Sequence, residues 1–438
     1  MEPGASRQSI LALWQIFAGA LLICLTCPAI GCSPFQLQPY SDLVLASADR
    51  TVALSADRPI DRPLNRAARL PGRSQAQIKT RLESLWRPSL LPTAWVNYSG
   101  LIATRYSLLN LAPGPIFQPG ELIVRHMGRR TSVQYISAWH PGRKLPLIVA
   151  VSGINGTVDG RITIEILENL FNSGNFHIVH LESVSSVNHQ VRNQQPFLGG
   201  FPEGVLLYQS VAALRSQPEL ADQISQVHLL GVSYGGLLCG IASHCEDQFQ
   251  RGVIDGAVLA YSPPLDLKVL FDNLAANTLI GNQIYQSYIG EAVQRLLQHM
   301  DVGVPHHELH QLSFDSFLHR VAFPQFQKVR PQLAAEFPSL PPVETPDDLY
   351  AISSVQPHFD SLGVPFLFVL AYDDPVVSPE DHFRKVLAEC SNQLVDGILL
   401  EDGGHLGFDL VTRSPFTSRL TEEYFRYWSA SPTRQANR

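Results

Sequence analysis

The sequence is poor in charge and lacks the short motifs of nucleotide and zinc sites. Only 16% of its 438 residues are charged and 45% are hydrophobic, which argues against a disordered or coiled-coil chain. Its 39 acidic residues outnumber its 32 Lys and Arg, so no basic excess points to nucleic acid. It contains no P-loop, no pair of CxxC motifs and no HExxH. These absences remove the usual sequence support for a nucleotide-phosphate site or a common zinc site.

Cysteine is also scarce. Three of the six cysteines lie at or before residue 32, and the other three are Cys239, Cys245 and Cys390. Three is an odd number, and their spacing fits no disulfide framework. We therefore expect buried thiols and at most one disulfide.

The N-terminal segment predicts export. Arg7 precedes an apolar run over residues 10–25, which is short for a membrane-spanning helix and is followed by small residues. Residues 29–32 read Ala-Ile-Gly-Cys, which resembles the lipobox of bacterial lipoproteins, where cleavage follows Gly31 and Cys32 receives a diacylglyceryl group. Lipidation of Cys32 implies a protein anchored to a membrane of the bacterial cell envelope. The alternative is an ordinary signal peptide, a chance cysteine and a secreted or periplasmic protein.

Composition and periodicity divide the chain into five segments. Residues 1–31 are the expected signal peptide, and residues 32–75, rich in Ala, Asp, Arg, Pro and Ser, are an expected tether or a loop packed on the domain. The two parts of one core follow at 76–262 and 363–438. The insertion between them, 263–362, is too long for an ordinary connection, and we interpret it as a lid over the carboxyl edge of a sheet.

From about residue 120 the sequence alternates between strand and helix patterns. The continuous apolar run 145–151 predicts a strand buried on both faces. Further strands are expected at 121–126, 132–139, 176–181, 226–232, 257–261, 365–371 and 396–400, and helices at 162–171, 205–214, 288–300 and 417–428. This alternation predicts an α/β protein whose mostly parallel central sheet is flanked by helices, with a helical lid insertion.

The strongest chemical signal is a G-x-S-x-G motif. Residues 231–235 read Gly-Val-Ser-Tyr-Gly, directly after an apolar strand and before a segment that can continue as a helix. A sharp strand-to-helix turn strains the serine backbone and leaves no room for side chains at the flanking positions. The motif therefore predicts that Ser233 is a nucleophile presented at the top of the sheet. The alternative is a strand-to-helix turn without catalytic function.

A serine nucleophile needs a base and an orienting carboxylate. His405 follows Gly403 and Gly404 just after the last predicted strand, a position suited to the base. Asp374, after the preceding strand, is the preferred acid; Asp373 is the second candidate and Asp402 a distant third. The chain order Ser233, Asp374, His405 is the Ser-Asp-His order of α/β-hydrolases. The carboxylate would fix the tautomer of the imidazole and stabilise the imidazolium.

The oxyanion hole should be made by two backbone N–H groups. The first is expected from Tyr234, the residue after the nucleophile. The second is expected from the loop after strand 145–151, which begins Ser-Gly-Ile-Asn-Gly at residue 152, with Ile154 as the preferred donor.

Two side-chain groups in the insertion are open to more than one interpretation. His306, His307 and His310 could bind a metal, but their spacing matches no common ligand set, so a solvated polar surface is the expectation and no metal site is assigned. The phenylalanines of the insertion could line an acyl pocket or form its core; core is expected, because aromatic residues mostly pack. They are Phe314, Phe317, Phe323 and Phe326.

These motifs together resemble the α/β-hydrolase superfamily over about residues 120–430. Three stretches resemble its YheT-like esterase branch: 347–354 at the end of the insertion, 371–375 around the acid, and 403–408 around the histidine. The resemblance implies hydrolysis of short- or medium-chain acyl esters without a cofactor. Two segments depart from the branch: Ser152-Gly153 replaces its usual His-Gly, and residues 182–186 replace its usual Arg-Gly turn.

The leading hypothesis is therefore a serine hydrolase acting on small-molecule carboxylic esters, a carboxylesterase or lipase-like enzyme. The same three residues could instead serve an amidase, a peptidase or an acyltransferase. A third hypothesis is a surface lipoprotein that uses the fold as a non-catalytic binding module. The intact Ser, Asp and His set argues against a mere binder, which needs none of them.

Overall fold

The computed structural model describes residues 74–86, 113–197, 199–276, 281–282, 284–286, 290–300, 302–409 and 415–429. The expected signal peptide, Cys32 and all but the last two residues of the expected tether lie outside these ranges. Within them, every helix is too short or too polar to span a bilayer.

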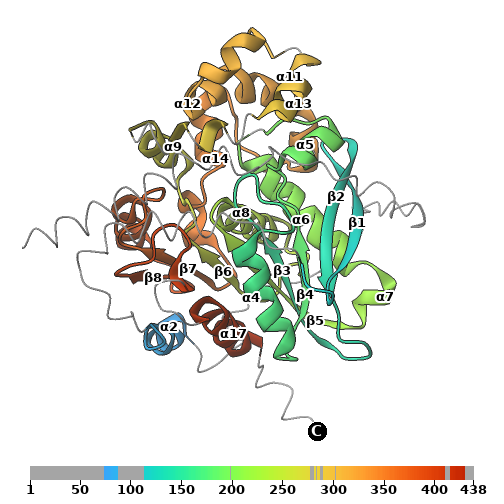
Figure 1. The fold of residues 1–438 in the computed structure, drawn as a ribbon, viewed down its shortest axis with the longest axis vertical. Helices are drawn as coiled ribbons and strands as arrows, with labels where there is room; N and C mark the ends of the chain where they lie inside the picture. The colour runs from blue at the N-terminus through green and yellow to red at the C-terminus, as the bar shows by residue number, and fades with distance from the viewer. Residues whose placement is uncertain are drawn as a thin grey trace, which may run out of the picture. The chain divides into compact units, whose positions relative to one another are not determined.

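One eight-stranded sheet organises the described residues (Figure 1). Its order is β1-β2-β4-β3-β5-β6-β7-β8. The pairs β1–β2 and β2–β4 are antiparallel and all others are parallel. The strands are β1 Gln118–His126, β2 Arg129–Ala138, β3 Leu145–Val151, β4 His177–Leu181, β5 Ile224–Val232, β6 Val258–Tyr261, β7 Phe366–Ala371 and β8 Val395–Leu400. This order and polarity define an α/β-hydrolase fold, as the sequence predicted.

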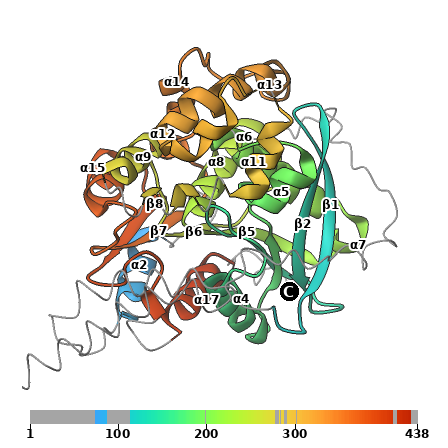
Figure 2. The ribbon, with the colours of Figure 1, turned by 45° about the horizontal axis from the view of Figure 1, so that its top comes forward.

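Helices cover both faces of the sheet (Figure 2). One layer contains α2 Gln75–Glu83, α4 Arg161–Asn172 and α17 Phe416–Ser429, and the other contains α6 Phe201–Arg215 and α8 Tyr234–Phe249. Strand β3 shows why its sequence is apolar throughout: Ile148 packs with the first layer and Leu147 and Val149 pack with the second. A half-exposed strand would carry polar side chains at alternate positions.

The described chain between β6 and β7 is mostly helical, as the sequence predicted for the insertion. Its elements are α9 Leu267–Ala276, α11 Glu291–Gln298, η4 His306–Gln311, α12 Phe314–Phe317, η5 Leu318–Ala322, α13 Phe323–Glu336, α14 Pro346–Ile352 and η6 Gln356–Ser361. Phe314, Phe317 and Phe326 are buried in the same apolar cluster as α6 and α8, and the partly buried Phe323 packs against it. These rings belong to the core, in line with the sequence expectation.

The described residues also form shorter elements, among them α5 Val187–Asn193, α7 Pro218–Ala221, η7 Glu380–Arg384 and α15 Lys385–Glu389. The sequence analysis expected none of these, and α5 matters most for the site. Its sequence, VNHQVRN, has almost no apolar face, so periodicity does not reveal it. Only His189 and Gln190 of this helix are buried, and the side chains of Gln190 and Arg192 hydrogen-bond to the segment that precedes it.

Candidate active site

Ser233 sits in a strained turn between β5 and α8. Its backbone has φ 53° and ψ −125°, a conformation that a non-glycine residue rarely adopts. A methyl group at Gly235 would run into the carbonyl oxygens of Val151 and Ser152, so only glycine lets α8 start this close to β3. The turn leaves the Ser233 side chain partly exposed at the carboxyl end of the sheet.

The structure brings Ser233 and His405 together although 172 residues separate them in the chain. The imidazole Nε2 lies 2.9 Å from the Ser233 hydroxyl oxygen, a hydrogen-bonding distance. His405 is only 5% exposed, so the surrounding protein holds its ring in place.

Asp374 completes this arrangement on the other side of the imidazole. Its Oδ2 lies 2.9 Å from His405 Nδ1, and its Oδ1 lies 3.2 Å away. Oδ1 also accepts the backbone N–H groups of Val376 and Val377, at 2.8 and 3.0 Å. The backbone of the acid loop therefore fixes which way the carboxylate faces.

Asp373, the second candidate for the acid, contacts the histidine loop in a different way. Its Oδ1 accepts the backbone N–H of Gly404 at 2.7 Å, one residue before His405. The pKa of Asp373 is raised to about 6, mainly by burial; the Gly404 N–H opposes this rise, and the nearby charges of Asp402 and Asp374 contribute to it. Among the described residues, the imidazole of His405 contacts Asp374 and not Asp402, the third candidate. Burial and the charge of Glu401 raise the pKa of Asp402.

The loop after β3 lies against the nucleophile. A Cβ placed on Gly153 would be 3.0 Å from the Ser233 Cβ and 3.4 Å from its hydroxyl oxygen, so this backbone passes directly beside the serine. Ile154 follows Gly153 in this loop, and Tyr234 begins α8 immediately after Ser233. The two expected oxyanion donors are thus the chain neighbours of Gly153 and of Ser233.

A polar network holds this loop in shape. Asn155 adopts a left-handed φ of 57° and donates its N–H to the Ser185 hydroxyl at 3.1 Å. The Gln190 side chain donates to the Ser185 carbonyl at 2.8 Å and accepts the N–H of Phe197 at 3.0 Å. The Phe197 ring packs edge-on against Tyr234 with centroids 5.5 Å apart. These contacts connect the two sides of the expected oxyanion hole.

The sequence analysis missed Ser185 and Gln190 as supporting residues. The only available signal was the serine-rich segment 182–186, which was noted as a departure from the esterase branch and given no role. Glu182 at its start is buried and forms a salt bridge with Arg192 of α5 at 2.8 Å. Burial by itself would raise the pKa of Glu182, but the nearby Arg192 guanidinium and His189 imidazole outweigh burial and lower that pKa.

Ser152, the other departure, also has a structural partner. Its hydroxyl lies 2.9 Å from His180 Nε2 and 3.1 Å from the Thr163 hydroxyl. His180 Nδ1 lies 3.1 Å from the Val158 carbonyl, so Nδ1 carries the proton and Nε2 accepts from Ser152. Burial lowers the pKa of His180 to about 4, which keeps it neutral at pH 7. This buried pair anchors the start of the oxyanion loop.

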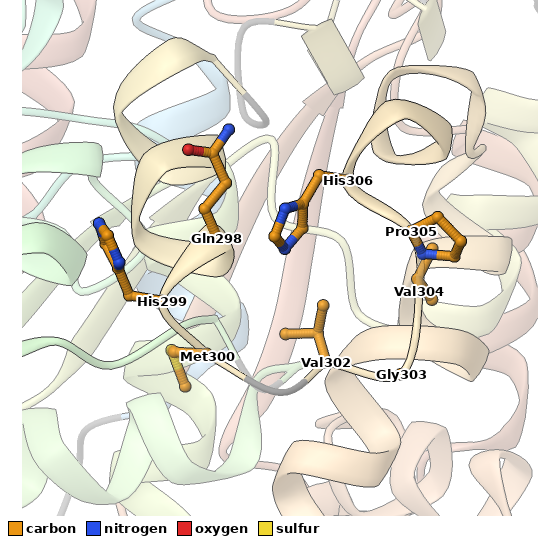
Figure 3. Close-up of a pocket in the computed structure, with 8 residues that line it drawn as sticks. All are labelled: Gln298, His299, Met300, Val302, Gly303, Val304, Pro305 and His306. Atoms are coloured by element: carbon orange, nitrogen blue, oxygen red, sulfur yellow. The ribbon is translucent and has the colours of Figure 1, made fainter.

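A pocket of about 580 Å³ lies in the insertion, where the chain runs from α11 to η4 (Figure 3). His306 and Gln298 line it together with apolar side chains such as Met300 and Val302. It includes none of the candidate catalytic residues. The described residues contain no group of three or more His, Cys, Asp or Glu placed to hold a metal ion.

Comparison with known proteins gives a resemblance of fold. No protein-family model and no curated protein matches the chain. A solved acylaminoacyl peptidase of Pyrococcus horikoshii is 15% identical with a TM-score of 0.42, over 78% of this chain and 46% of that one. An esterase of Pyrococcus furiosus is 14% identical with a TM-score of 0.44, over 74% and 99%. One of two studied Rhizomucor miehei esterases is 16% identical with a TM-score of 0.43, over 81% and 96%. At such low similarity, we infer no activity from these proteins.

Proposed function

We propose that this protein is a serine hydrolase that cleaves carboxylic esters through Ser233, His405 and Asp374. The observation that supports the proposal is the continuous contact from the hydroxyl to the imidazole to the carboxylate, at 2.9 Å for each step. A nucleophile, a base in reach of it and a group that orients the base are the required parts of this chemistry. The strained backbone of Ser233 adds to the argument, because such strain concentrates at functional sites.

The proposed reaction has two halves. The Ser233 hydroxyl oxygen attacks the ester carbonyl carbon while His405 Nε2 takes the hydroxyl proton, and Asp374 accepts the Nδ1–H and stabilises the imidazolium. The N–H groups of Tyr234 and Ile154 bind the oxyanion, and the imidazolium returns the proton to the departing alkoxide. Water then attacks the acyl-enzyme by the same route in reverse. The products are the carboxylic acid and the alcohol.

The proposal is tested with a fluorophosphonate probe, which labels activated serines. Wild-type protein should be labelled, and a Ser233→Ala variant should not, with turnover of p-nitrophenyl butyrate reduced by about 10⁶. Ser243→Ala is a suitable control, because Ser243 is buried in α8 and donates only to the Cys239 carbonyl. Equal labelling of wild type and Ser233→Ala would refute the catalytic proposal and favour a non-catalytic binding module.

Amides, peptides or acyl transfer on the same residues are the second candidate function. A panel of p-nitrophenyl esters against aminoacyl anilides separates them: the ester proposal predicts faster turnover of esters than of any anilide of matched acyl group. Partition of the acyl group to an added alcohol in preference to water would instead indicate an acyltransferase.

We further propose that Cys32 carries a lipid anchor, which holds the enzyme to a membrane of the bacterial cell envelope. The lipobox-like residues 29–32 support this. Expression with labelled palmitate in a bacterial host tests it: wild type should incorporate label and Cys32→Ser should not, and equal incorporation would exclude this anchor.

A further inference from the structure

The loop that carries His405 has an unusual backbone. Gly403 has φ 141° and Gly404 has φ 55°, and Leu406, directly after the histidine, has φ 73°. A left-handed conformation at a branched residue such as Leu406 is strained, and such strain persists only where surrounding contacts impose it. The position of the imidazole therefore depends on whatever holds this loop.

Two hydrogen bonds described for the loop hold its start. Gly407 donates its N–H to the Gly403 carbonyl at 2.8 Å, which closes the turn on itself. Gly404 donates its N–H to Asp373 Oδ1 at 2.7 Å, which ties the turn to the acid loop. The acid loop therefore hydrogen-bonds to the histidine loop at two points. Asp373 accepts from the Gly404 backbone, and Asp374, the next residue, binds the His405 imidazole.

The Asp373 carboxylate is poorly suited to a purely structural role. Among the described residues its second oxygen, Oδ2, is buried without a hydrogen-bond partner. The charges that act on it are negative as well: Asp402 from the histidine loop, with Glu401 beside it, and Asp374 from its own loop. An uncharged side chain would avoid the unfavourable burial of this charge.

We propose, on the basis of the proposed hydrolase function, that Asp373 is a positioning residue whose ionised carboxylate holds the histidine loop so that His405 reaches Ser233. A hydrogen bond to a charged acceptor is about twice as strong as one to a neutral acceptor. Asp373 thus lowers the stability of the fold while it holds the base in place, and it acts on the base through the Gly404 backbone.

Two substitutions of Asp373 distinguish the effect of the hydrogen-bond acceptor from the effect of its negative charge. Asp373→Ala removes the partner of the Gly404 N–H, and kcat for p-nitrophenyl butyrate at pH 8 should fall by about tenfold or more, because small displacements of a catalytic group have large effects on rate. Asp373→Asn keeps a neutral acceptor, and its kcat should stay within about threefold of wild type.

The pH dependence supplies a readout that a merely structural residue would not move. A protonated carboxyl and an amide are alike in shape and charge, so wild type and Asp373→Asn should converge in acid. The ratio of their kcat/KM values should fall from about three at pH 8 toward one at pH 5, with a midpoint near 6.

Stability gives an independent measurement. The pKa of Asp373 is raised from 3.8 to about 6 in the folded protein, so its stabilising contribution is present below pH 3.8 and is lost as pH rises through 6. Asp373→Asn should therefore have a higher Tm than wild type at pH 8 and the same Tm at pH 4. Asp402→Asn is the control: it keeps the bond between Gly404 and Asp373 and should retain wild-type activity at pH 8. Because the Asp402 charge raises the pKa of Asp373, the ratio of kcat/KM with and without Asp373→Asn, measured in this variant, should have its midpoint at lower pH.

The outcomes are distinct. If wild type does not react with the fluorophosphonate, the proposed function fails whatever Asp373 does. If it reacts, a ratio that stays constant from pH 5 to 8, or equal activity of Asp373→Ala and wild type, overturns the role of Asp373. A Tm of Asp373→Asn no higher than that of wild type at pH 8 also counts against it.

Discussion

Replacement of Asp374 by asparagine tests which carboxylate orients the base. In the structure Oδ1 of Asp374 accepts two backbone N–H groups, from Val376 and Val377. An asparagine there must keep its carbonyl oxygen on these donors, which turns its NH₂ group toward Nδ1 of His405. The imidazole must then accept at Nδ1 and carry its proton on Nε2, facing the Ser233 hydroxyl. In this tautomer it cannot remove the serine proton.

The expected loss follows from this wrong tautomer. A geometry-preserving substitution of this kind lowers kcat by ~10⁴, which corresponds to about 5 kcal/mol of transition-state stabilisation. Because both backbone bonds survive, Tm should change little. Steady-state hydrolysis of p-nitrophenyl butyrate measures the rate, and ¹⁵N NMR of the ring nitrogens of His405 reports the tautomer.

Asp373→Asn is the matched control, because it makes the same chemical change one residue away. At pH 8 it should reduce kcat by no more than about threefold. If Asp373→Asn loses as much activity as Asp374→Asn, or if Asp374→Asn stays within tenfold of wild type, the assignment of the acid is wrong.

Two further predictions follow from contacts away from the three catalytic side chains. Ser185→Ala removes the acceptor of the Asn155 N–H and should lower kcat by about tenfold with little change in KM; Ser183→Ala, which keeps that bond, should have a smaller effect, and equal effects would contradict the role of Ser185. His244 stacks on His358 with centroids 3.8 Å apart, and burial, with the added effect of His358, lowers its pKa from 6.5 to about 4. The unfolded chain therefore takes up a proton there as pH falls through 6.5, and urea unfolding should show that wild type loses about 2 kcal/mol more than His244→Phe between pH 7 and pH 5; an equal loss would refute this.

Much of the fold could be predicted from local sequence because its elements have strong patterns. Strand β3 is apolar throughout, and its bounds, residues 145–151, are those predicted. Helix α17 carries a clear amphipathic pattern and differs from its predicted range by one residue at each end. Helix α5 escaped prediction because its sequence has almost no apolar face and its two buried side chains, His189 and Gln190, are polar.

In the candidate site, too, some residues could be predicted from local sequence and others could not. The sequence alone singled out Ser233, because a strand, a glycine-bounded turn and a helix are local and leave a local pattern. It also indicated His405 as the base and favoured Asp374 as the acid, with Asp373 second and Asp402 a distant third, because His405 and Asp374 each follow a predicted strand.

Local patterns cannot say which of two adjacent carboxylates faces an imidazole 31 residues away. The tertiary structure decides between them. The backbone N–H groups of Val376 and Val377 orient the Asp374 carboxylate toward the ring, and the Gly404 N–H binds the Asp373 carboxylate. Hydrogen bonds between distant loops depend on where the sheet places each loop. The spatial order of the strands differs from their order along the chain, so local sequence does not reveal it.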